Sequence, residues 1–187
     1  MKIFTMSCRA ESRHLSSPNA FILRLIVIML LISSLVTAQT SRTAKVLRVI
    51  DGDTFVLTTG EKVRLLGVDT PELNSKDSRE KLLAQQAALI TKNFAEGKTI
   101  KLTSDKVSPS GRDLERGNIW AVDIFGRTLA YAWRINKEGK DSLFLQAELL
   151  KSGLARILMY DKKKMYYGLF YNLRNTARRN KLGIWSK

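Results

Sequence analysis

Carboxylates and arginines gather in three short segments of the chain. These are residues 50–54 (Ile-Asp-Gly-Asp-Thr), 64–72 (Arg-Leu-Leu-Gly-Val-Asp-Thr-Pro-Glu) and 123–127 (Asp-Ile-Phe-Gly-Arg). Two carboxylates and a backbone carbonyl can hold a hard cation that keeps part of its water shell, and a further carboxylate can accept a proton from water. Two guanidinium groups can make bidentate contacts with phosphate oxygens. Together the segments supply the groups that hydrolysis of a phosphodiester bond requires.

Each segment also has a plain structural interpretation. The Asp-Gly pair in residues 50–54 is a strong signal for a tight hairpin turn. Arg64 could be a solvated side chain of a strand, and Asp69 or Thr70 could cap the helix that follows. Residues 123–127 could form a surface turn. The chemical interpretation depends on the three segments meeting in space.

The elements that must position these segments are predominantly strands. Short β-prone runs are predicted at residues 44–50, 54–57, 62–68, 99–104, 119–122 and 128–133, with a short extended piece at 155–160. Apolar periodicity predicts helices at residues 78–93, 142–151 and 164–180. Gly153 and Gly183 are expected to end the last two helices, and residues 106–117 to form a loop. The pattern predicts an α+β fold, a five-stranded OB-fold barrel with about three helices, and a generic α+β domain is the alternative.

Residues 1–38 have the pattern of a secretory signal peptide. Four basic residues precede an apolar run over residues 25–36, and Val36-Thr37-Ala38 follows with small or modest residues at the positions that a signal peptidase reads. The run is shorter than the roughly 20 apolar residues of a membrane span, although a retained anchor is the alternative. We therefore expect an exported protein, secreted or periplasmic, with its domain at residues 43–187 and no stable membrane association after cleavage.

The only cysteine, Cys8, and the only histidine, His14, lie in this leader. Without them the mature chain cannot form a disulfide, use a Ser-His-Asp or Cys-His mechanism, or bind zinc through imidazole or thiolate. Carboxylate, Arg, Lys, Tyr and an oxygen-liganded cation such as calcium or magnesium remain for catalysis. Removing four basic residues and one acid with the leader lowers the net charge from +15 to +12. This charge favours a polyanionic partner, nucleic acid first and an anionic membrane surface second.

Five stretches follow one another in a specific order between residues 44 and 186. They are residues 50–54, 64–72, 123–131 (Asp-Ile-Phe-Gly-Arg-Thr-Leu-Ala-Tyr), 152–156 (Ser-Gly-Leu-Ala-Arg) and 181–186 (Lys-Leu-Gly-Ile-Trp-Ser). In these stretches the chain resembles the staphylococcal nuclease (thermonuclease) family. The resemblance implies the OB-fold, calcium-dependent activity on both DNA and RNA, and cleavage that leaves 3′-phosphate ends.

The resemblance also implies a role for individual residues. The calcium ligands of the family correspond to Asp53, Asp69 and the carbonyl of Thr70. Asp51 corresponds to an acidic neighbour that supports the metal through water. The catalytic arginines and glutamate of the family correspond to Arg64, Arg127 and Glu72. Glu72 would then take a proton from the attacking water or orient it, while the arginines stabilise the transition state.

The substrate-binding positions depart from the family pattern. Phe125 stands where the family has a nucleotide-binding tyrosine, and Ile124 stands beside it in place of a lysine. Stacking survives with Phe125, but a hydroxyl and a charge are lost. Of two tyrosines expected to flank the base, only Tyr160 is evident. The loop at residues 106–117 is also longer than in the best-known member.

Three functions remain open at this point. The first is a monomeric nuclease with little sequence specificity. The second is a catalytically weak nucleic-acid-binding OB-fold module, although such modules typically lack the acidic and arginine positions present here. The third, a basic adhesion or membrane-associated domain, explains the charge but not the three segments.

Overall fold

The structure is a computed structural model that describes residues 40–104, 120–159 and 165–186. These residues belong to one compact unit, residues 39–187, which is described by itself. The predicted leader, the predicted loop at residues 106–117 and Tyr160 lie outside the described residues. Within the described ranges, no helix combines the length and the apolar character that a bilayer span needs.

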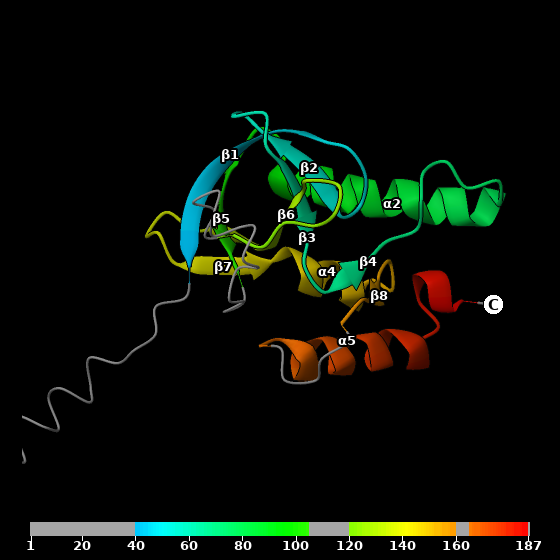
Figure 1. Ribbon diagram of the computed structural model, residues 1–187. Helices are drawn as coiled ribbons and strands as arrows, with labels where there is room; N and C mark the ends of the chain where they lie inside the picture. The colour runs from blue at the N-terminus through cyan, green and yellow to red at the C-terminus, as the bar shows by residue number, and fades with distance from the viewer. Residues whose placement is uncertain (1–39, 105–119, 160–164, 187) are drawn as a thin grey trace, which may run out of the picture. The chain divides into compact units, whose positions relative to one another are not determined.

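The main sheet is mostly antiparallel and OB-like, as predicted (Figure 1). Its strands are β1 (Ser41–Val49), β2 (Thr54–Leu57), β3 (Lys62–Leu65), β5 (Thr99–Thr103), β6 (Thr128–Ile135) and β7 (Asp141–Phe144). β1, β2 and β3 form the predicted three-stranded meander, and β5 pairs with both β1 and β6. β3 also pairs with β6 in parallel, so that the pairings of these five strands close into a ring.

Five strands form this ring, as a five-stranded fold predicts, and the described residues contain three further strands. β7 extends the sheet beyond β6, and β4 (Val68–Asp69) pairs with β8 (Arg156–Ile157) in a separate two-stranded sheet. The predicted single strand at residues 62–68 is broken because Gly67 takes a positive φ of 83°. Val122 makes only an isolated bridge to Thr128 in the part of residues 119–122 that the structure describes.

The first helix, α2 (Ser78–Ala95), matches the predicted helix at residues 78–93 and is two residues longer. It begins where the Asp77 carboxylate accepts hydrogen bonds from the backbone N–H groups of Arg79 and Glu80. Its buried residues recur at helical spacing and face the sheet: Ala84, Ala87, Thr91, Phe94 and Ala95. α2 therefore contacts both β1 and the segment at residues 50–54.

The remaining helices of the described residues are α4 (Leu145–Lys151), α5 (Tyr167–Arg179) and the 3-10 helix η1 (Gly183–Trp185). α4 packs against both α2 and α5 and lies between them in Figure 1. The predicted helix at residues 142–151 was wrong over its first residues, which form β7. Phe144 ends β7 with its ring stacked on Trp133 at 3.9 Å, so packing against β6 overrides the helical pattern there.

Gly153 ends α4 in the left-handed conformation, as predicted, but Gly183 does not end α5. The C-cap of α5 is Asn180, and Lys181 takes the positive φ that follows it. Gly183 instead lies so close to the backbone of Gly153 that a Cβ would not fit between them. Its function is to join the C-terminal segment to the end of α4.

Candidate active site

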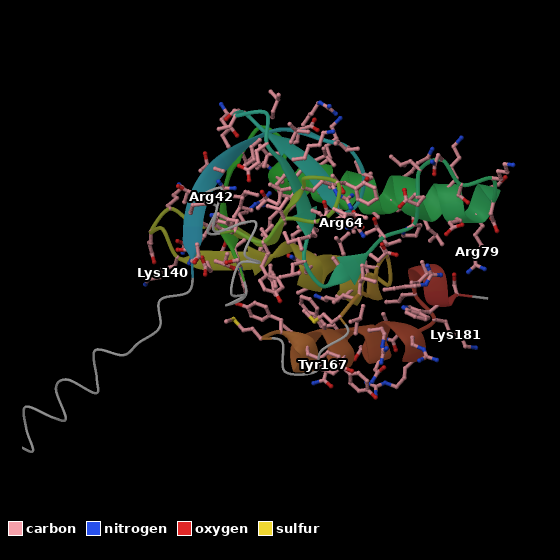
Figure 2. The ribbon with its side chains drawn as sticks, in the orientation of Figure 1. Arg42, Arg64, Arg79, Lys140, Tyr167 and Lys181 are labelled. Carbon is pink, nitrogen blue, oxygen red and sulfur yellow. The ribbon has the colours of Figure 1, made fainter. Side chains whose placement is uncertain are left out.

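Five of the predicted site residues line one pocket of about 750 Å³. They are Arg64, Asp69, Glu72, Phe125 and Arg127. Figure 2 shows Arg64 on β3, beside the turn that leads to β4. The second and third chemical segments therefore meet at this pocket, although they lie more than fifty residues apart in the chain.

Asp53 connects the first segment to the pocket through hydrogen bonds with Arg64 and Thr70. It follows the turn between β1 and β2, and only 1% of its surface is exposed. Its Oδ1 accepts hydrogen bonds from the Arg64 guanidinium at 2.7 Å and the Thr54 hydroxyl at 3.0 Å. Its Oδ2 accepts from the backbone N–H of Thr70 at 2.9 Å and the Thr70 hydroxyl at 3.1 Å. A single buried carboxylate thus joins β2, β3 and the segment after β4.

Burial strongly affects the charge on Asp53. Removal from water raises its pKa to about 6, against the lowering effect of the Arg64 charge and together with the raising effect of Asp51. Asp51 lies in the same turn, where its Oδ1 accepts a hydrogen bond from the Asp53 backbone N–H at 3.0 Å. A positive charge placed close to Asp53 would therefore favour the ionised form of its carboxylate.

Arg64 bridges two carboxylates at the pocket wall. One terminal nitrogen donates to Asp53, and the other donates to the Asp69 Oδ1 at 2.6 Å. Burial works against its charge, but Asp53, Asp69 and Asp51 together raise its pKa above the ordinary value. Three carboxylates face one guanidinium, so the site retains an excess of negative charge.

This excess and the donor atoms fit a hard divalent cation. In the described part of the chain, no three Asp, Glu, His or Cys side chains gather as a ready metal cluster. The predicted ligand set needs only two carboxylates and a backbone carbonyl, and Asp53 and Asp69 are brought to the same guanidinium while Thr70 lies directly against Asp53. Carboxylate and carbonyl oxygens are the ligands that calcium prefers.

Gly52 explains how the first segment reaches this position. Residues 50–53 do form the turn between the antiparallel strands β1 and β2. Gly52 does not take a positive φ, however, so a left-handed turn conformation is not the reason for a glycine there. A Cβ there would lie 2.6 Å from the Thr70 hydroxyl and 2.7 Å from the Ala87 Cβ on α2. The Thr91 hydroxyl of α2 also donates to the Gly52 carbonyl at 2.6 Å. Gly52 is thus required for close packing of the Asp51–Asp53 turn between α2 and Thr70.

Arg127 is positioned by Asp123, which sequence reasoning did not single out as a site residue. The Asp123 carboxylate accepts from the Arg127 side chain at 2.7 Å and from the backbone N–H groups of Phe125 and Arg127, both at 2.9 Å. Partial burial opposes the charged form, but these hydrogen bonds lower the pKa of Asp123. The sequence contains a signal for this contact, because Asp123 precedes Arg127 by four residues with Gly126 between them. Gly126 turns the chain there with a φ of 76°.

The pocket also presents accessible groups. Glu72 lies on the connection between β4 and α2, and it is exposed at the pocket edge. The Phe125 ring is 74% exposed, and the Arg127 guanidinium lies 5.3 Å from its centroid. Ile124 is 93% exposed beside it. Lys62 of β3 adds a third basic residue to Arg64 and Arg127, and sequence reasoning did not identify it.

Comparisons with known proteins give a family match and three relatives. The family model described as "Staphylococcal nuclease homologue" matches residues 62–187. The thermonuclease of Staphylococcus hyicus is 32% identical over 148 residues, which cover 78% of this chain and 76% of that protein. The thermonuclease of Staphylococcus intermedius is 32% identical over 143 residues, which cover 75% and 74% of the two chains. An uncharacterised protein of Methanocaldococcus jannaschii is 32% identical over 161 residues, 76% of this chain and 70% of its own length.

Proposed function

This chain belongs to the staphylococcal nuclease family, and from that membership we propose that it is a calcium-dependent nuclease that hydrolyses phosphodiester bonds in DNA and RNA. The observation that carries the proposal is that Arg64, Asp69, Glu72 and Arg127 line one pocket. These residues come from two distant segments, and metal-assisted hydrolysis of a phosphodiester bond can use all of their chemical types in one place.

The arginines bind and stabilise the phosphate. Arg64 is fixed by Asp53 and Asp69, and Arg127 by Asp123, so neither side chain must be ordered when the substrate arrives. A planar guanidinium can contact two phosphate oxygens at once. Positive groups that are already oriented favour the additional negative charge that develops in the transition state.

Glu72 acts on the attacking water. Its exposed carboxylate lines the pocket in which the arginines lie, and it can accept a hydrogen bond or a proton from a water molecule there. The leaving oxygen and the attacking water must lie on opposite sides of phosphorus. The pocket therefore needs a water-accessible acceptor, and Glu72 provides it.

Calcium would be held by Asp53, Asp69 and the Thr70 carbonyl, with Asp51 supporting it through water. Once bound, it would polarise a phosphate oxygen and neutralise part of the developing charge. The excess of carboxylates around Arg64 supports this assignment. Calcium tolerates an irregular set of side chains, a carbonyl and waters better than magnesium does.

The substrate-binding surface supports broad specificity. The exposed Phe125 ring offers a stacking surface that any base can use, and Lys62 and the arginines contact the phosphate backbone rather than base edges. We propose Phe125 and Tyr160 as base-stacking residues, products with 3′-phosphate ends, a monomer, and export through the leader at residues 1–38.

The test is hydrolysis of DNA and RNA by the purified protein in calcium, in magnesium and after addition of a chelator. We expect cleavage in calcium, little in magnesium, and none in the chelator until calcium is restored. A protein that binds single-stranded DNA but does not cleave it under any of these conditions would instead be the binding module. Cleavage that zinc supports and calcium does not would contradict the ligand assignment.

A further inference from the structure

The C-terminal helix carries a row of aromatic and arginine side chains. Tyr167, Tyr171, Arg174 and Arg178 are spaced by four, three and four residues, so they lie along one face of α5. Trp185 of η1 continues the row beyond the end of the helix. We call these five residues the α5 stripe. Figure 2 labels Tyr167 at one end of α5 and Lys181 just beyond the other, so the stripe runs along the length of the helix.

The members of the stripe contact one another. The Tyr167 and Tyr171 rings are stacked, with centroids 6.1 Å apart and an interplanar angle of 23°. The Arg174 guanidinium lies 4.7 Å from the Tyr171 ring, and the Arg178 guanidinium lies 5.1 Å from the Trp185 ring. These contacts limit the freedom of the side chains, so less conformational entropy is lost when a ligand binds to them.

The charge of this region suits a polyanion. Residues 165–186 contain four basic side chains, Arg174, Arg178, Arg179 and Lys181, and no acid. Tyr171 is 43% exposed. Aromatic rings in contact with guanidinium groups are suited to single-stranded nucleic acid, whose bases stack and whose phosphates pair with arginine.

A membrane surface fits this helix less well. The fully buried residues of α5, Phe170 and Ala177, belong to the side of the helix that packs on the protein, and α5 contacts α4. Insertion of the apolar face into a bilayer would require α5 to leave α4. The stripe lies beside that face. While α5 is docked, Tyr171 and Arg178 are exposed, and the other three members are half-buried.

α5, the helix that carries the stripe, lies close to the pocket in the fold. Met159, which lines the pocket, and Phe170 of α5 both pack against Gly67. β8, which precedes Met159, contacts α5 as well. A strand that leaves the pocket past Met159 therefore reaches the region of α5.

We infer that the α5 stripe is a second binding site for single-stranded nucleic acid, outside the catalytic pocket, which holds a long strand while the pocket acts on one of its phosphodiester bonds. The inference deepens the proposed nuclease function and uses it only to identify the substrate class. Binding can be measured in chelator, where no cleavage is expected. The binding measurement therefore tests the stripe, and the cleavage measurement separately tests the nuclease proposal.

The experiment compares Tyr171→Ala/Arg174→Gln with the parent and with Arg179→Gln. Arg179 is also on α5 but lies off the stripe, so Arg179→Gln removes the same charge from the same helix. Binding is measured by fluorescence anisotropy in chelator with a labelled oligothymidylate longer than the about 4–16 nucleotides that one OB fold covers. Hydrolysis of a dinucleotide in calcium reports on the pocket alone, and thermal melting reports on the fold.

We expect the double variant to bind the long strand about tenfold more weakly, the change that loss of one stacked base would give. The slope of log affinity against log salt should fall by about 0.7 on loss of the Arg174 phosphate contact. Dinucleotide hydrolysis, melting and the Arg179→Gln control should stay close to the parent. The inference is overturned if the double variant binds the long strand like the parent, or if Arg179→Gln weakens binding equally. It is also overturned if the double variant loses affinity only for vesicles of anionic lipid.

Discussion

Both pocket arginines are held by carboxylates that are not expected to touch the scissile phosphate. Arg64 is fixed between Asp53 and Asp69, and Arg127 is fixed by Asp123. The pairs keep the guanidinium groups oriented at the pocket wall, which is the physical basis of preorganised transition-state stabilisation. The residues that position the arginines are therefore as informative as the arginines themselves.

Asp123 allows a prediction of pH dependence. Its pKa is lower in the folded chain than the ordinary value, so its contribution to stability is present above about pH 3.9 and is lost as pH falls through the lower folded value. Both carboxylate oxygens of Asp123 accept hydrogen bonds, and asparagine keeps only one such oxygen. If that oxygen faces the backbone N–H groups, the amide NH2 of Asp123→Asn faces the Arg127 side chain, which offers only donors. We expect a lower free energy of unfolding than in the parent at neutral pH, with a difference that shrinks below about pH 3.9.

Urea unfolding of the two proteins from pH 7 down to the acid limit measures this difference. Every other carboxylate is shared by the two proteins, so it cancels in the comparison. A difference that stays constant through the acid range would show that the Asp123 charge does not stabilise the turn.

Glu72 allows a prediction of rate. Glu72→Gln keeps the size of the side chain but removes its ability to take a proton from water. We expect kcat to fall by about 10² or more, the usual contribution of a general base, with KM little changed. Because Glu72 is exposed, melting should not move. An unchanged kcat would show that Glu72 takes no part in catalysis. A fall in kcat much smaller than the predicted one would show that Glu72 only orients the water.

At the scale of single residues, the sequence could predict which residues would meet but not how they would be held. Arg64, Asp69, Glu72, Phe125 and Arg127 line one pocket, while the roles given to them stay predictions. Asp123 was missed because an aspartate before a glycine turn has an ordinary structural explanation. Arg64 bridges two carboxylates because the chain turns at Gly67. The sequence shows a continuous β-prone run there, so this turn was not predicted.

At the scale of elements, the packing of α2 sets the position of the Asp51–Asp53 turn. Gly52→Ala would place a methyl group within 2.8 Å of Thr70 and Ala87, so one of them must shift. We expect a loss of about 1–3 kcal/mol in the free energy of unfolding, the usual cost of overpacking. Activity should fall as well, because Thr70 is hydrogen-bonded to Asp53.

Gly168→Ala is the matched control. Gly168 lies on α5 in open space, and a Cβ there meets nothing within 4 Å. The same substitution should stabilise the protein by about 0.4–1 kcal/mol, because alanine restricts the unfolded chain. Chemical denaturation of both variants provides the measurement. Equal effects at the two positions would contradict close packing at Gly52.

Local patterns predicted elements well where packing agreed with them. β2 was predicted with its observed bounds, and α2 began at the predicted residue. The errors lie where a distant partner decides the structure. Residues 141–144 form β7 because Phe144 stacks on Trp133 of β6, and sequence periodicity over residues 142–151 contains no information about that contact.

At the scale of the whole molecule, the OB-like sheet brings the chemical segments to one pocket by strand pairing. β3 carries Arg64, and the segment with Asp123 and Arg127 leads into β6, its parallel neighbour. Strand counting alone could not predict this pairing, because it joins strands that are distant in the sequence. The order of the family motifs could predict the pairing, because the resemblance to the family implied the whole fold.

The turnover of Arg127→Lys, measured beside that of the parent, shows whether this pocket catalyses cleavage. Lysine keeps the charge but loses the planar fork, so kcat for single-stranded DNA in calcium should fall by about 10²–10³. Affinity for the same strand in chelator and the melting temperature should change little, because the lost contact is made mainly in the transition state. If Arg127→Lys cleaves like the parent, or if the parent binds the strand and does not cleave it, the catalytic pocket described here is wrong.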